Sequence, residues 1–178
     1  PKSKTLLLSL DIDEPQKAFI LAKEIAYNYL EITERLYTFS WIKFDNFDQV
    51  LNNFYASYFA GALLIPRQKL IDELNLFLSK TDPKPQEMIA LMSGFNVSPE
   101  SFYQRLTNIL PKDFQLKNLF FLRLSHQIGT DTYQIKKELH ITNQQEPHAN
   151  EMNEHYCRRW VSIRTIEQSL KQNKNHFF

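Results

Sequence analysis

The stretch AFILAKEIAYNYL, residues 18–30, decides how the N-terminal part of this chain folds. Apolar side chains recur in it at three-to-four spacing, at Phe19, Ala22 and Ala26, which predicts an amphipathic helix that continues to about residue 32. Pro15 suits the first turn of such a helix, and the acidic residues just before it favour a helix N-terminus. We therefore expect the fold to open on a helix with one apolar face.

Three polar side chains in this helix, Lys23, Glu24 and Tyr27, have the spacing of a zinc-peptidase helix. In the motif H-E-x-x-H, two histidines lie one turn apart on the same face, and the glutamate activates the zinc-bound water. Here Lys23 and Tyr27 occupy the two histidine positions, while Glu24 keeps the position of the general base. A protonated lysine does not ligate zinc and repels a cation placed beside it. The pentad is also a common helical string, so its meaning depends on a second stretch.

That second stretch is ASYFAGALLIP, residues 56–66. It closely resembles the A-N-x-F-A-A-x-L-L-M-P signature of the ImmA/IrrE-type metallopeptidase family, with Ser57, Gly61 and Ile65 as its departures. In that family the signature helix packs against the H-E-x-x-H helix and brings a third, acidic ligand from just upstream. The upstream window VLNNFYASYF, residues 50–59, contains no Asp or Glu. The resemblance therefore implies a degenerate zincin-like scaffold with no metal and no catalytic residue.

The rest of the pattern predicts an α+β fold that is mostly helical. Residues 44–66 are the most apolar region and are apolar on more than one face, which is typical of a central helix, and a further amphipathic helix is expected over 67–80. Residues 85–110 read as two short helices joined at Gly94, the second capped by Ser98. This is a helix-turn-helix outline, but its charges sum to zero when the flanking Lys84 is included, so a packed helical hairpin is favoured over a DNA-binding element.

Beyond Pro111 the pattern changes from helical to extended. Residues 119–124 and 133–141 are predicted to be paired strands, and the chain ends in an extended segment and a final helix. Residues 5–12 form either a short strand or an extended segment. We therefore expect a helical peptidase-like domain over 1–111 and a small β-containing unit over 112–178.

The order of these motifs is similar to that in the C-terminal half of the short-chain fatty acyl transcriptional regulators of the XRE type. The motifs that carry the resemblance, over roughly residues 15–165, are the two helices above, then FNVSPESFYQRL, LFFLRLS and HYCRRW. In these bacterial regulators an N-terminal helix-turn-helix domain binds DNA, and the following domains sense acyl-CoA metabolism. The resemblance implies a non-enzymatic effector-sensing domain that binds a short-chain acyl-CoA, and a homodimer, because such regulators usually read two half-sites. Some relatives hold an iron–sulfur cluster, but Cys157 alone cannot, so no cofactor is expected.

An acyl-CoA needs basic groups for its phosphates and an apolar slot for its acyl chain. The candidate ligand-binding residues are Lys23 and Tyr27 in the former active site, Tyr55 and Tyr58 on the next helix, and Tyr156, Arg158, Arg159 and Trp160 near the C-terminus. Each also has a structural interpretation, as a surface charge, a core aromatic or the filling of a vacated pocket. Glu24 could equally pair with Lys23 or Arg35 for structural reasons alone.

Composition narrows the function classes. With three glycines and no G-x-G-x-x-G or G-x-x-x-x-G-K-[ST] motif in 178 residues, neither of these nucleotide-binding loops is present. A net charge of +1 gives no general attraction to nucleic acid or membrane, and no apolar run has the length of a membrane span. One cysteine and no signal peptide favour a cytoplasmic protein. The alternatives to the acyl-CoA sensor are a pseudo-peptidase interaction or dimerisation module and, much less favoured, an active metallopeptidase.

Overall fold

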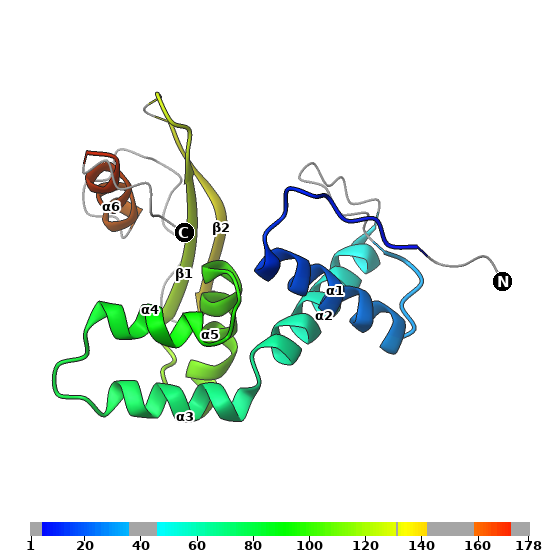
Figure 1. Ribbon diagram of the computed structural model, residues 1–178, viewed down its shortest axis with the longest axis horizontal. Coiled ribbons are helices and arrows are strands. Elements are labelled where there is room, and N and C mark those ends of the chain that lie inside the picture. Colours follow the sequence, from blue (N-terminus) through cyan, green and yellow to red (C-terminus); the bar gives the residue numbers. More distant parts are fainter. Residues whose placement is uncertain (1–4, 36–45, 131, 142–158, 172–178) are drawn as a thin grey trace. The chain divides into compact units, whose positions relative to one another are not determined.

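The computed structural model describes residues 5–35, 46–130, 132–141 and 159–171 of the chain (Figure 1). Their secondary structure comprises α1 (Glu14–Tyr29), α2 (Phe47–Leu64), α3 (Arg67–Leu78), α4 (Pro85–Ser93), α5 (Pro99–Asp113), β1 (Leu119–His126), β2 (Tyr133–Ile141) and α6 (Arg159–Lys171). The predicted α+β class, mostly helical with a small sheet, is confirmed. The chain divides into two compact units, Pro1–Arg105 and Leu106–Phe178, and each is described separately. The domain boundary at residue 111 stays a prediction.

Helix α1 begins where the sequence predicts. The Asp13 side chain accepts a hydrogen bond from the Gln16 backbone N–H at 2.8 Å, and Pro15 lies in the first turn. The helix ends at Tyr29, slightly before the expected residue 32, because Glu31 adopts a positive φ of 56°. Upstream, residues 5–12 form no strand, which leaves the extended segment of the two alternatives.

Helices α1 and α2 pack together through small side chains. Ala26 on α1 and Ala56 on α2 are 0% exposed and form a buried cluster with Tyr27, against which Phe59 of α2 packs. Other large side chains of α2 lie at the surface, since Phe54 is 54% exposed. The prediction that α2 is a central helix is therefore wrong. Its contact face is built around alanine, and several of its bulky apolar residues lie outside that face.

Helices α3 and α4 and the first half of α5 form the rest of the first unit. Leu70 and Leu74 of α3 are buried, and the rings of Phe95 and Phe102 meet at 6.1 Å beside the turn that joins α4 to α5. Ser98 caps α5 as predicted, because its Oγ accepts from the Ser101 N–H at 3.2 Å. The two short helices expected over 85–110 are thus confirmed.

The second unit contains a β-hairpin and a helix. Strands β1 and β2 pair antiparallel from Leu119↔Ile141 to His126↔Tyr133, with a register shift after Arg123. Helix α6 packs against β1, and the Tyr133 hydroxyl donates to Oε1 of Glu167 at 3.4 Å. The strands are therefore those that the sequence predicts, with β1 two residues longer. In the described part of the chain, no helix combines the length and apolar character that a membrane span requires.

Candidate ligand site

The positions of the two zinc-peptidase histidines lie in the contact between α1 and α2. Helical spacing puts Lys23 and Tyr27 one turn apart on the same face of α1. Lys23 is 9% exposed and Tyr27 is 5% exposed. A lysine this deeply buried is rare unless it has a partner, so its contacts determine what the site can do.

Lys23 is tied to α2 through Asn53. Its ammonium Nζ donates a hydrogen bond to Oδ1 of Asn53 at 2.7 Å, and lies 5.9 Å from the centre of the Tyr27 ring. Asn53 stands three residues before Ala56, inside the window in which the ImmA/IrrE resemblance implies an acidic ligand. The neutral amide cannot compensate the positive charge as a carboxylate would. Burial accordingly lowers the pKa of Lys23 from its ordinary value, because desolvation penalises the ammonium form.

Tyr27 is buried with an unsatisfied hydroxyl. The hydroxyl has no hydrogen-bond partner among the residues that the structure describes, and the Arg35 guanidinium lies 5.1 Å from the ring centre. Burial raises the pKa of Tyr27; the positive charge of Arg35 opposes this rise and the negative charge of Glu24 adds to it. The phenol is therefore held in its neutral, hydrogen-bond-donating form.

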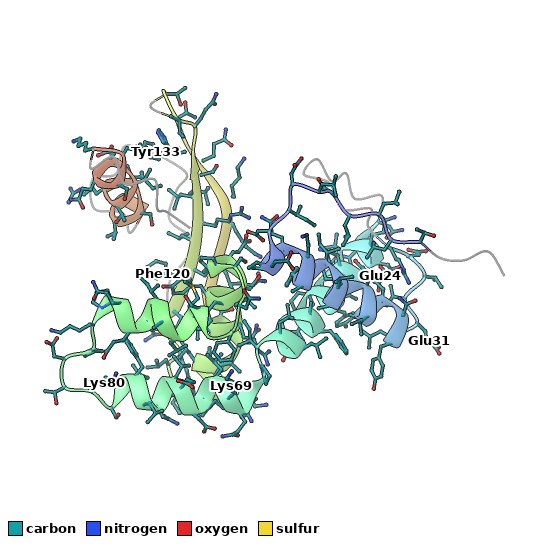
Figure 2. All side chains as sticks on the ribbon, viewed as in Figure 1. Glu24, Glu31, Lys69, Lys80, Phe120 and Tyr133 are labelled. Carbon is teal, nitrogen blue, oxygen red and sulfur yellow. The ribbon has the colours of Figure 1, made fainter. Side chains whose placement is uncertain are left out.

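Glu24, which keeps the general-base position, is part of an ion pair. Its carboxylate bonds to the guanidinium of Arg35, and the Asn28 side-chain amide donates to Glu24 Oε1 at 3.1 Å. Arg35 also donates from Nε to the Ile32 carbonyl at 3.3 Å, which fixes the guanidinium beyond the end of α1. Of the two partners considered for Glu24, the structure shows Arg35. Figure 2 labels Glu24 on α1.

These residues do not fit the zinc ion that the H-E-x-x-H spacing implies. Where the first imidazole would be there is a buried ammonium that already bonds to Asn53, and where the second would be there is a phenol. Within the described ranges, no three His, Cys, Asp or Glu side chains are grouped so that they could hold a metal ion. The arrangement instead presents hydrogen-bond donors in a low-dielectric contact.

The other candidate residues lie apart from this pair. Tyr55 and Tyr58 are each 48% exposed on α2, where their rings lie 5.9 and 6.2 Å from that of Phe54. Tyr55 is two residues from Asn53, which turns it by roughly 200° around the helix, away from Lys23. Neither tyrosine contacts Lys23 or Tyr27 through the described side chains.

The C-terminal candidates are only partly described. Tyr156, Cys157 and Arg158 lie outside the described residues, and Arg159 and Trp160 contribute only their backbone, as the first two residues of α6. Their roles in binding a ligand stay predictions.

Sequence reasoning missed Asn53. The only sequence signal for it is that Asn52 and Asn53 are two polar residues within an otherwise apolar stretch that contains no acid. It also missed a groove of about 670 Å³ between α3 and α4, with Leu76, Phe77 and Leu91 on its walls. Figure 2 labels Lys69 and Lys80, which also line this groove.

Residues 1–107 match the family described as IrrE N-terminal-like domain (Peptidase_M78). The match covers more than half of the chain and includes both helices of the candidate site. No curated protein and no solved structure matched the sequence.

Proposed function

The chain belongs to the IrrE N-terminal-like domain family (Peptidase_M78), and on that premise we propose that it is a non-enzymatic sensor of a short-chain acyl-CoA. The observation that carries the proposal is the hydrogen bond from Lys23 to Asn53, which joins the two helices at the position implied for the metal. The family's scaffold is peptidase-like. In this proposal the site offers hydrogen-bond donors to a small molecule, where a metallopeptidase has side chains that coordinate a metal.

The contacts support the proposal that the site is not catalytic. A zinc-activated water needs a cation with an open coordination position and a free carboxylate beside it. In place of the metal ion the chain has the Lys23 ammonium, which offers no coordination position for a water. The Glu24 carboxylate is not free either, because it forms an ion pair with Arg35. Binding without turnover is the use that this arrangement supports.

The choice of acyl-CoA is supported by the order of the sequence motifs. Two groups of residues are the proposed candidates for this ligand: Lys23 and Tyr27 for its thioester end, and Arg158 and Arg159 for its phosphates through charge-assisted hydrogen bonds. Tyr156 and Trp160 are proposed as aromatic partners of the adenine ring. The protein acts as a cytoplasmic homodimer, and the ligand adjusts DNA binding by a helix-turn-helix domain outside these 178 residues.

The test is a calorimetric titration of this chain with propionyl-CoA, using acetyl-CoA and free CoA as comparisons. Saturable binding in the micromolar range, weakened by Arg158→Ala and Arg159→Ala, is the expected result. Elemental analysis of the same preparation measures zinc. A stoichiometric zinc content would refute the non-enzymatic assignment, and an absence of heat with all three compounds would refute the acyl-CoA assignment.

A second candidate function, a protein-interaction or dimerisation module, is favoured by the aromatic cluster of Phe54, Tyr55 and Tyr58. All three rings are about half exposed on one helix, and exposed apolar clusters commonly mark interaction sites. Under this alternative no CoA compound binds, and Phe54→Ser lowers the sedimentation coefficient of the protein. Binding of propionyl-CoA with no effect of Phe54→Ser on sedimentation would exclude it.

A further inference from the structure

The α1–α2 contact holds more hydrogen-bond donors than acceptors. The Lys23 ammonium has three N–H donors, and the described residues provide one acceptor, the Asn53 amide oxygen. The Tyr27 hydroxyl, on the same face one turn later, has none. Buried donors normally have partners, and an unsatisfied one costs its full desolvation. Two neighbouring side chains whose donors lack acceptors indicate that the site binds a molecule with an acceptor group.

The chemistry of the missing acceptor follows from the surroundings. Among the described residues no carboxylate lies within ion-pair distance of Lys23, because Glu24 bonds to Arg35 instead. A buried cation without a counter-charge favours an anionic acceptor over a neutral one. The neighbouring side chains are apolar: Tyr27 belongs to a buried cluster with Ala26 and Ala56, against which Ile32 and Phe59 pack.

We propose that Lys23 and Tyr27 bind the carboxylate of a short aliphatic acid, with its hydrocarbon end against the apolar side chains between α1 and α2. A carboxylate offers two oxygens that accept from the ammonium and the phenol together. The aliphatic part would pack against Ile32 and Phe59, the partly buried side chains beside the buried cluster. This inference rests on the proposed non-catalytic use of the site, and it is independent of whether CoA binds elsewhere on the chain.

The test uses sodium butyrate as the probe, titrated into the ¹⁵N-labelled full chain and followed by NMR chemical shifts. Butyramide, which has the same shape and no charge, is the comparison ligand. The test variants are Tyr27→Phe, which removes one hydroxyl, and Lys23→Met, which removes the charge. Their matched controls are Tyr29→Phe and Lys17→Met on the same helix, since Tyr29 is 74% exposed and Lys17 pairs with Glu14 at the surface.

The expected result is saturable binding of butyrate that weakens at least about tenfold for either test variant and for butyramide, a loss of roughly 1.4 kcal/mol or more. The two control variants keep the wild-type affinity. Equal butyrate affinity in wild type and Tyr27→Phe overturns the proposal, as does an absence of binding to the wild type. Tyr27→Phe keeps the test valid if Lys23→Met fails to fold.

A parallel titration with propionyl-CoA separates this proposal from the proposed function. Acyl-CoA binding without any response to butyrate leaves the sensor assignment intact and removes the carboxylate site. Butyrate binding that depends on both Lys23 and Tyr27, without any CoA affinity, supports the carboxylate site and removes the acyl-CoA assignment.

Discussion

Replacing Tyr27 by phenylalanine should stabilise the ligand-free protein. The substitution keeps the ring, its packing against the alanines and most of its attraction for the Arg35 guanidinium, and it removes only the hydroxyl. That hydroxyl is fully buried and has no partner among the described residues. Most substitutions in a core destabilise a protein, so a gain in stability here would be diagnostic.

The magnitude follows from two opposing contributions. A buried, unsatisfied hydroxyl costs about 1–3 kcal/mol in the folded state, and Tyr27→Phe removes that cost. The void left by one oxygen atom reduces this gain in stability by a few tenths of a kcal/mol, at about 24 cal/mol per Å³ of void. We expect the free energy of unfolding to rise by about 1 kcal/mol, which for a chain of this size raises the thermal midpoint by roughly 2–4 °C.

The assay is urea and thermal unfolding followed by circular dichroism, with Tyr29→Phe as the control. The Tyr29 hydroxyl belongs to a side chain that is 74% exposed, so its removal should change stability by less than about 0.5 kcal/mol. A loss of about 1 kcal/mol or more in Tyr27→Phe would refute the reasoning, because it would mean that the hydroxyl has a stabilising partner.

Three further predictions concern the same face of α1. Because burial lowers the pKa of Lys23 below its ordinary value of 10.5, the unfolded chain binds more protons than the folded protein between these two pKa values. Stability should therefore rise with pH in that window up to about pH 10, above which the raised pKa of Tyr27 contributes with the opposite sign, and Lys23→Met should remove the rise in urea titrations. A double-mutant cycle of Glu24→Gln and Arg35→Met should give a coupling of about 0.5–1 kcal/mol, since both side chains are about one-third exposed; a coupling of zero would mean that solvent screens the pair. The triple variant Lys23→His, Tyr27→His, Asn53→Glu should bind about one zinc per chain by elemental analysis. A variant with the two histidines alone should bind zinc more weakly. An absence of zinc from the triple variant would contradict the placement of Asn53 beside the two histidine positions.

The predictions that succeeded from sequence alone depend on local chemistry. The start of α1 at Asp13 and Pro15 and the cap of α5 at Ser98 are decided by a few neighbouring residues, so their side chains identify them. The prediction that α2 is a buried, central helix was wrong because periodicity counts apolar residues without regard to their size. Packing selected the alanines for the contact and left Phe54 exposed. Asn53 was missed because its role depends on a partner 30 residues away.

The two costs on this face of α1 argue that it is a functional site. A hydrogen bond from an ammonium contributes about 1.5–3 kcal/mol, while burying the charge costs several kcal/mol, so the contact of Lys23 with Asn53 alone does not repay its desolvation. The unsatisfied Tyr27 hydroxyl adds a second cost one turn away. Two neighbouring buried polar groups with too few partners are rare in a structural core. They are common in binding sites, because the ligand supplies the interactions that the protein lacks. Lys23 also places a cation between α1 and α2, where the zinc-helix spacing implies one, and bonds it to α2. The donors that remain have no acceptor among the described residues, and the proposed carboxylate would supply one.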